Sequence, residues 1–152
     1  MKPGEGEAVW SLGGKFTLKL TGTDSGDRFS VTEVTAFHTA EPPMHIHHQE
    51  DEAWYVLDGH MTFYVGEQVL EAPAGSFVFG PQGVPHSFTV DTEPTRVLVF
   101  ASPAGFERFA LDLGHPATDD TPPGDLAMDP AVVGPVAERY KIDIVGPPNR
   151  PH

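Results

Sequence analysis

Proline and glycine divide this chain into short apolar runs, and that division limits it to folds built from short strands. The 152 residues include 16 Gly and 16 Pro, about one residue in five. Turn residues such as Asp58-Gly59 and Gly66-Glu67 separate the runs. This pattern is typical of a β-sandwich or barrel and unlike that of a helical bundle. The predicted strands span residues 15–21, 29–37, 53–57, 61–65, 68–71, 76–79, 86–90 and 96–102.

Within these strands, apolar and polar side chains alternate as they do in antiparallel sheets that bury one face. Met61, Phe63 and Val65 fall on one face of their strand, and Thr62 and Tyr64 fall on the other. We therefore expect an all-β fold with an apolar interior between its sheets.

The last third of the chain has a different pattern, because apolar residues occur there at helical spacing. Asp129-Pro130 could begin a helix, but Gly134-Pro135 should interrupt it, so only its second half is predicted. We expect a barrel over residues 1–103 and a helical and loop extension packed on it over residues 104–152. The predicted elements of the extension are a helix at 104–113 ending at Gly114, a loop at 115–128, a helix at 135–140 and a strand at 142–145.

The charge of the chain argues against some classes of partner. Lys plus Arg is 9 and Asp plus Glu is 22, so the formal net charge is −13. Nucleic acids and anionic membrane surfaces attract basic patches, so neither is an expected partner. Without cysteine, disulfides and thiolate zinc sites are excluded. With no visible signal peptide and no bilayer-spanning apolar run, we expect a cytoplasmic protein.

Residues 45–52, with the sequence His-Ile-His-His-Gln-Glu-Asp-Glu, concentrate candidate metal ligands. Residues i and i+2 of a strand point to the same face, so His45 and His47 can reach one point. His86 and Glu52 could join them, giving three imidazoles and one carboxylate. This donor set suits Fe, Ni, Co, Mn, Cu or Zn better than Ca or Mg. Asp51 is the rival carboxylate.

The same residues resemble two motifs of the cupin superfamily, which fall here in segments 45–59 and 75–86. The resemblance is close over residues 41 to 90. Val90 departs from it, because the family often has Asn at this position, although that Asn is not a metal ligand. The motifs are His45-x-His47-x4-Glu52-x6-Gly59 and Gly75-x5-Pro81-x-Gly83-x2-His86.

The resemblance implies a double-stranded β-helix, the jelly-roll barrel, with a single cupin domain. It also implies that one divalent transition metal is held near the barrel centre by His45, His47, Glu52 and His86. The parity of Glu52 is opposite to that of His47, so a bend at residues 49–51 must turn its carboxylate inward. The neighbours His48, Glu50 and Asp51 are then expected to be exposed. A cupin that keeps the motif without binding metal is the alternative.

Among cupins, the chain is most similar to the quercetin 2,3-dioxygenase-like group, through Ala-Trp-Tyr-Val-Leu-Asp-Gly after the first motif. Enzymes of that group bind a flavonol at a metal held by three His and one Glu, and cleave its ring with dioxygen. Carried over, Glu52 would be both ligand and catalytic base. A metal-dependent isomerase, cyclase or lyase, and a ligand-binding cupin without turnover, remain open alternatives. Single-domain cupins usually form dimers, so we expect a homodimer.

Strand parity predicts an apolar, aromatic pocket around the metal. A sugar phosphate would need a basic side chain, and no Arg or Lys falls among the inward positions. We therefore expect a neutral or phenolic small-molecule substrate. The predicted pocket residues are Trp54, Val56, Met61, Phe63, Phe79 and Phe88.

Overall fold

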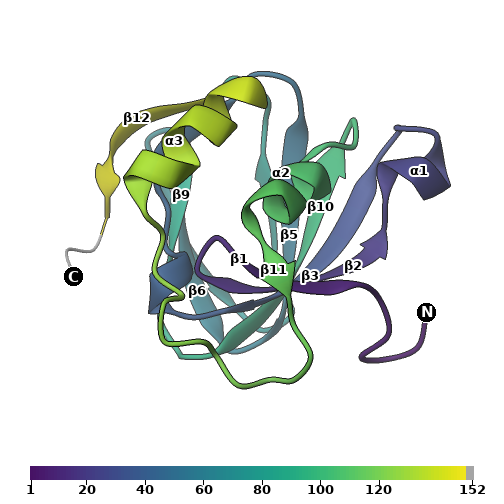
Figure 1. Cartoon of the computed structure of the whole chain (residues 1–152). Coiled ribbons are helices and arrows are strands. Elements are labelled where there is room, and N and C mark those ends of the chain that lie inside the picture. The colour runs from purple at the N-terminus through teal and green to yellow at the C-terminus, as the bar shows by residue number, and fades with distance from the viewer. Residues whose placement is uncertain (150–152) are drawn as a thin grey trace.

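A computed structural model describes residues 1–149, which form two antiparallel sheets around a common interior (Figure 1). The strands are β1 (Ala8–Ser11), β2 (Gly14–Leu20), β3 (Ser30–Ala36), β4 (Pro43–His47), β5 (Asp51–Asp58), β6 (His60–Val65), β7 (Gln68–Pro73), β8 (Phe77–Gly80), β9 (His86–Val90), β10 (Thr95–Ser102), β11 (His115–Pro116) and β12 (Ile142–Pro148). The helices are α1 (Gly22–Ser25), α2 (Phe106–Leu113), α3 (Pro130–Arg139) and the 3-10 turn η1 (His38–Ala40).

The order of the strands is that of a jelly roll. One sheet runs β11-β1-β2-β3-β10-β5-β8, and the other runs β12-β4-β9-β6-β7. The chain passes from one sheet to the other between β3 and β4, between β4 and β5, and between β5 and β6. The prediction of an all-β jelly roll with a C-terminal helical extension is confirmed.

Between residues 104 and 149, the chain contributes strands to both sheets as well as covering them. Strand β11 pairs with β1, and β12 pairs with β4, so the extension supplies an edge strand to each sheet. Figure 1 shows α1 on one side of the molecule and β12 on the opposite side, with α2 between α1 and α3. A division of the chain at residue 103 stays a prediction. Within residues 1–149, no helix has the length and apolar character needed to cross a bilayer.

The prediction that Gly134-Pro135 interrupts the second helix is wrong, because α3 continues through Pro135. The Asp129 side chain caps the helix by accepting a hydrogen bond from the Ala131 backbone N–H at 3.0 Å. The turn after Pro135 is held by packing, since Ala137 is buried in a cluster with Phe109 and Ile142. Tertiary contact here outweighs the loss of one helical hydrogen bond.

A close contact between β5 and β8 of the large sheet lies next to the barrel interior. Trp54 pairs with Val78, and Gly80 is two residues further along the same inward face. A Cβ atom on Gly80 would lie 2.8 Å from the ring of Trp54, which is only 3% exposed. Phe79 therefore points outward and is 52% exposed, so its assignment to the pocket is wrong.

Replacing Gly80 with Ala should force the buried Trp54 ring to move. Overpacking of this kind costs about 1–3 kcal/mol. We expect Gly80→Ala to lower the free energy of unfolding by roughly this amount in urea titrations. Gly124→Ala is the matched control, because its added Cβ meets nothing within 4 Å. Equal unfolding midpoints for the two variants would contradict the close contact.

Candidate metal centre

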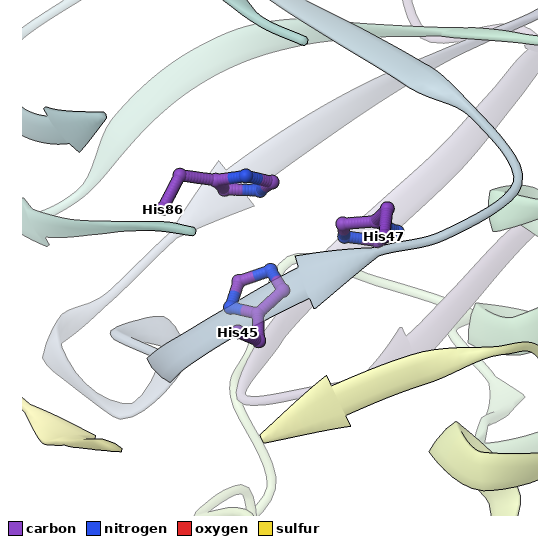
Figure 2. A group of neighbouring side chains, drawn as sticks. All are labelled: His45, His47 and His86. Carbon is purple, nitrogen blue, oxygen red and sulfur yellow. The ribbon is translucent and has the colours of Figure 1, made fainter. Parts of the chain in front are cut away.

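Three strands bring the candidate ligands together in the barrel interior. His45 and His47 are on β4, His86 begins β9, and Glu52 is on β5. Because β4 and β9 pair with His45 directly opposite His86, strand register brings these two side chains together. Figure 2 shows the three imidazoles gathered around one point. Glu52 reaches the same point from the other sheet.

The distances between these groups are short enough for one ion to contact all of them. A ring nitrogen from each of the three histidines lies within 4.8 Å of the others. Nε2 of His47 lies 3.3 Å from Oε1 of Glu52, and Nε2 of His86 lies 3.2 Å from Oε2. The rings of His47 and His86 are nearly parallel, at an interplanar angle of 5° (Figure 2).

The outer nitrogen of each imidazole faces an oxygen acceptor. Nδ1 of His45 lies 2.8 Å from the carbonyl of Pro43, and Nδ1 of His47 lies 2.6 Å from Oε1 of Glu50. Nδ1 of His86 is 3.4 Å from the Val84 carbonyl, a longer contact. When Nδ1 donates its proton to such an acceptor, Nε2 keeps a free lone pair. Metal-ligating histidines are oriented in this way.

Buried polar atoms at the centre have no hydrogen-bond partner among residues 1–149. They are Nε2 of His47, Nε2 of His86 and Oε1 of Glu52. Nε2 of His47 faces Oε1 of Glu52 at 3.3 Å and Nε2 of His86 faces Oε2 at 3.2 Å, but neither imidazole nitrogen makes a hydrogen bond within the described residues. A divalent cation would satisfy all three atoms at once, and imidazole and carboxylate are ordinary ligands for transition metals. The residues present therefore fit a metal.

The pKa values of Glu52 and His45 favour the metal-binding form of both side chains near neutral pH. Burial would raise the pKa of Glu52, but the imidazoles of His47 and His86 lower it to about 2. Burial and the neighbouring His86 and His47 lower the pKa of His45 to about 3. Burial opposes a charge on His47, but the carboxylates of Glu52 and Glu50 outweigh it and raise the pKa of His47.

Glu50 is the residue of this centre that sequence reasoning placed wrongly. It was expected to be exposed, but it is only 5% exposed, because its carboxylate turns inward to His47. His48 and Asp51 are exposed, as expected. Asp51 accepts a hydrogen bond from the backbone N–H of Gln82 at 2.8 Å. The sequence did contain a signal for this contact, because Glu50 follows the candidate ligand His47 by three residues.

An apolar cavity of about 90 Å³ adjoins the four candidate ligands. Trp54, Met61 and Phe88 line it, whereas Val56 and Phe63 are fully buried in the surrounding core. The roof comes from residues that the sequence did not assign to the site, and these are Leu12, Phe106, Phe109, Met128 and Ile142.

One roof residue, Phe106 at the start of α2, stands edge-on to His47 with ring centroids 6.2 Å apart. The helical spacing of Phe106 and Phe109 indicated a core-facing surface, but not which part of the core it would cover.

Comparison with known proteins identifies the domain. Residues 34–101, which carry all four candidate ligands, match the family model of the cupin domain. The chain therefore contains a cupin domain. A solved RmlC-like cupin from Shewanella frigidimarina has the same fold, with a TM-score of 0.58 at 19% identity over 71% of this chain and 94% of that one.

Two curated relatives match shorter stretches. Quercetin 2,3-dioxygenase of Bacillus subtilis is 32% identical over 72 residues, which are 47% of this chain and 21% of the enzyme. An uncharacterized protein of Streptomyces coelicolor is 39% identical over 56 residues, which are 37% of this chain and 53% of that protein. The matched region thus spans about a fifth and about half of these relatives.

Removing one candidate ligand should remove the metal. We expect His47→Ala and His86→Ala to lose most of the bound metal after reconstitution and desalting, as measured by elemental analysis. His60→Ala is the control, because His60 lies away from the cluster and pairs with Asp91 at 2.9 Å. Full metal content in both site variants would show that the ligands are assigned wrongly.

Glu50→Gln should weaken metal binding without removing a ligand, because the amide attracts the Nδ1 proton of His47 less strongly. Loss of such an outer carboxylate typically lowers metal affinity about 10- to 100-fold. Competition with a chromogenic chelator would measure the change. Asp51→Asn, which alters an exposed carboxylate at the next position, should leave the affinity unchanged. Equal affinities of the two variants would contradict an orienting role for Glu50.

Proposed function

We propose that this protein is a metal-dependent oxygenase, similar in chemistry to quercetin 2,3-dioxygenase, acting on a small phenolic or enolic molecule. The observation that carries the proposal is the convergence of three imidazoles and one carboxylate, with buried polar atoms that make no hydrogen bond in the described part of the chain, beside an apolar cavity. The match to the Bacillus enzyme supports the same reaction class.

The cavity wall favours a neutral aromatic substrate. Its lining within residues 1–149 includes neither Lys nor Arg, so nothing in it would pair with a phosphate or a carboxylate. Aromatic and aliphatic side chains form the rest, among them Trp54, Phe88 and Val99. Such walls bind a planar ring and keep water away from the reacting atoms.

Glu52 is the residue that would move a proton. Its carboxylate is ionised near neutral pH, and Oε1 has no hydrogen-bond partner. A substrate hydroxyl directed at this oxygen could hydrogen-bond to Glu52, and the carboxylate would take the proton only from an acidic hydroxyl, because a pKa of about 2 makes it a weak base. A divalent metal held by the four side chains would supply Lewis acidity and access to dioxygen chemistry.

A metal-dependent isomerase, cyclase or lyase is the second candidate, and a cupin that binds a ligand without turnover is the third. Proton-shuttling enzymes generally use an acid or base that is free to titrate. In this cavity, the titratable side chains are the four candidate ligands themselves. Because Glu52 could move a proton in either reaction, the preference for the oxygenase rests on the similarity to the Bacillus enzyme.

The expected homodimer remains a proposal. Tyr55 and Phe77 pair across β5 and β8 on the outer face of the large sheet, and Phe79 continues that face. These three aromatic side chains are 39%, 64% and 52% exposed, so the association of two copies through this face would bury apolar surface.

Oxygen consumption separates the three candidates. The metal-loaded protein would be incubated with phenol, catechol or a flavonol in air, where an oxygen electrode records consumption. The same incubations would be repeated without dioxygen. We expect oxygen uptake to equal the consumption of one of these substrates, and we expect no uptake with the His86→Ala variant. Turnover without dioxygen would instead indicate the isomerase or lyase. A substrate recovered unchanged from a stable complex would indicate the binding protein.

A further inference from the structure

A second and larger hollow lies outside the metal cavity, and Met128 lines both of them. The outer hollow has a volume of about 540 Å³, against about 90 Å³ for the inner cavity. It lies between the start of β4, the first turns of α3 and strand β12. The two spaces thus meet at a single half-buried side chain.

The inner cavity is small for the substrates of the proposed reaction. An apolar cavity of about 150 Å³ binds benzene, so an inner cavity of about 90 Å³ has no room for more than one ring. A molecule with a second ring must extend beyond the inner cavity, and Met128 is the side chain that the linings of the two spaces share.

The lining of the outer hollow suits an apolar ring. Pro43, Val133 and Ile144 contribute apolar walls. At its polar edge, His38 and Glu41 are engaged with each other, at 3.3 Å between Nδ1 and Oε1. A third hollow also reaches Met128, but Asp125 and Asp129 line it, and carboxylates disfavour an apolar ring.

Met128 is suited to separate the two spaces. It lies in residues 117–129, which form neither helix nor strand. Methionine is unbranched and flexible, and its thioether packs favourably against aromatic rings. The side chain can therefore turn aside for a ring that passes it and then pack on that ring.

We propose that the outer hollow binds the distal ring of an elongated, neutral phenolic substrate whose hydroxyl-bearing ring occupies the inner cavity at Met128. The inference rests on the proposed function, because it takes the inner ring to bind beside the metal ligands. It adds the substrate class, a two-ring phenol, and makes Met128 and Val133 the residues that determine selectivity for length.

The test compares phenol with 4-phenylphenol on the Co²⁺-loaded protein, using the visible absorption of Co²⁺ to measure both dissociation constants. Val133→Trp would place an indole ring in the outer hollow and reduce the space left for a ligand ring. We expect it to reduce the preference for 4-phenylphenol over phenol at least about tenfold, which is a change of about 1.4 kcal/mol. Val132→Trp is the matched control, because the neighbouring Val132 is 56% exposed and does not line the outer hollow.

A second variant keeps the test decisive if Val133→Trp does not fold, which circular dichroism would reveal. Met128→Ala opens the boundary between the two spaces, and we expect faster association of 4-phenylphenol with it. If phenol perturbs the Co²⁺ spectrum but neither variant changes the preference or the rate, the outer site is overturned while the proposed function stands. If neither phenol perturbs the spectrum, the proposed function falls, and the outer site falls with it.

Discussion

The carboxylate of Glu52 crosses the barrel interior and meets two imidazoles of the opposite sheet, and this contact organises the whole centre. Its oxygens lie 3.3 and 3.2 Å from His47 and His86. A buried charge of this kind is tolerated only with compensating partners, so the two sheets must be held at one spacing. The contact between Gly80 and Trp54 beside it contributes to that spacing. Fold and site thus depend on the same few contacts.

The sequence predicted those features that follow from local periodicity. Alternation placed Met61 and Phe63 inside, and the i, i+2 spacing of His45 and His47 directed both toward one point. The periodicity argument failed where the inward or outward direction of a side chain was assigned without knowing which strand lies beside it. Phe79 was placed inside because its neighbours in the sheet were unknown, whereas the register of β5 and β8 places Val78 and Gly80 on the inward face.

Other parts could not be predicted because they depend on contacts between distant residues. Glu50 was expected to face solvent because its inward turn depends on the bend between β4 and β5. α3 continues through Pro135 because Ala137 finds a place beside Phe109 and Ile142. The cavity roof from α2 and the following loop belongs to the same class, since no local pattern shows which interior a distant helix will cover.

The position of β12 has a consequence for how faithfully the centre forms. With β12 on one side and β9 on the other, β4 is an internal strand of its sheet. A slip of β4 by one residue would turn both of its histidines out of the barrel and put Ile46 in their place. Pairing with β12 along its length and with β9 at His86 opposes such a slip. The strand β12 therefore helps to fix the register of ligands that lie nearly a hundred residues before it in the chain.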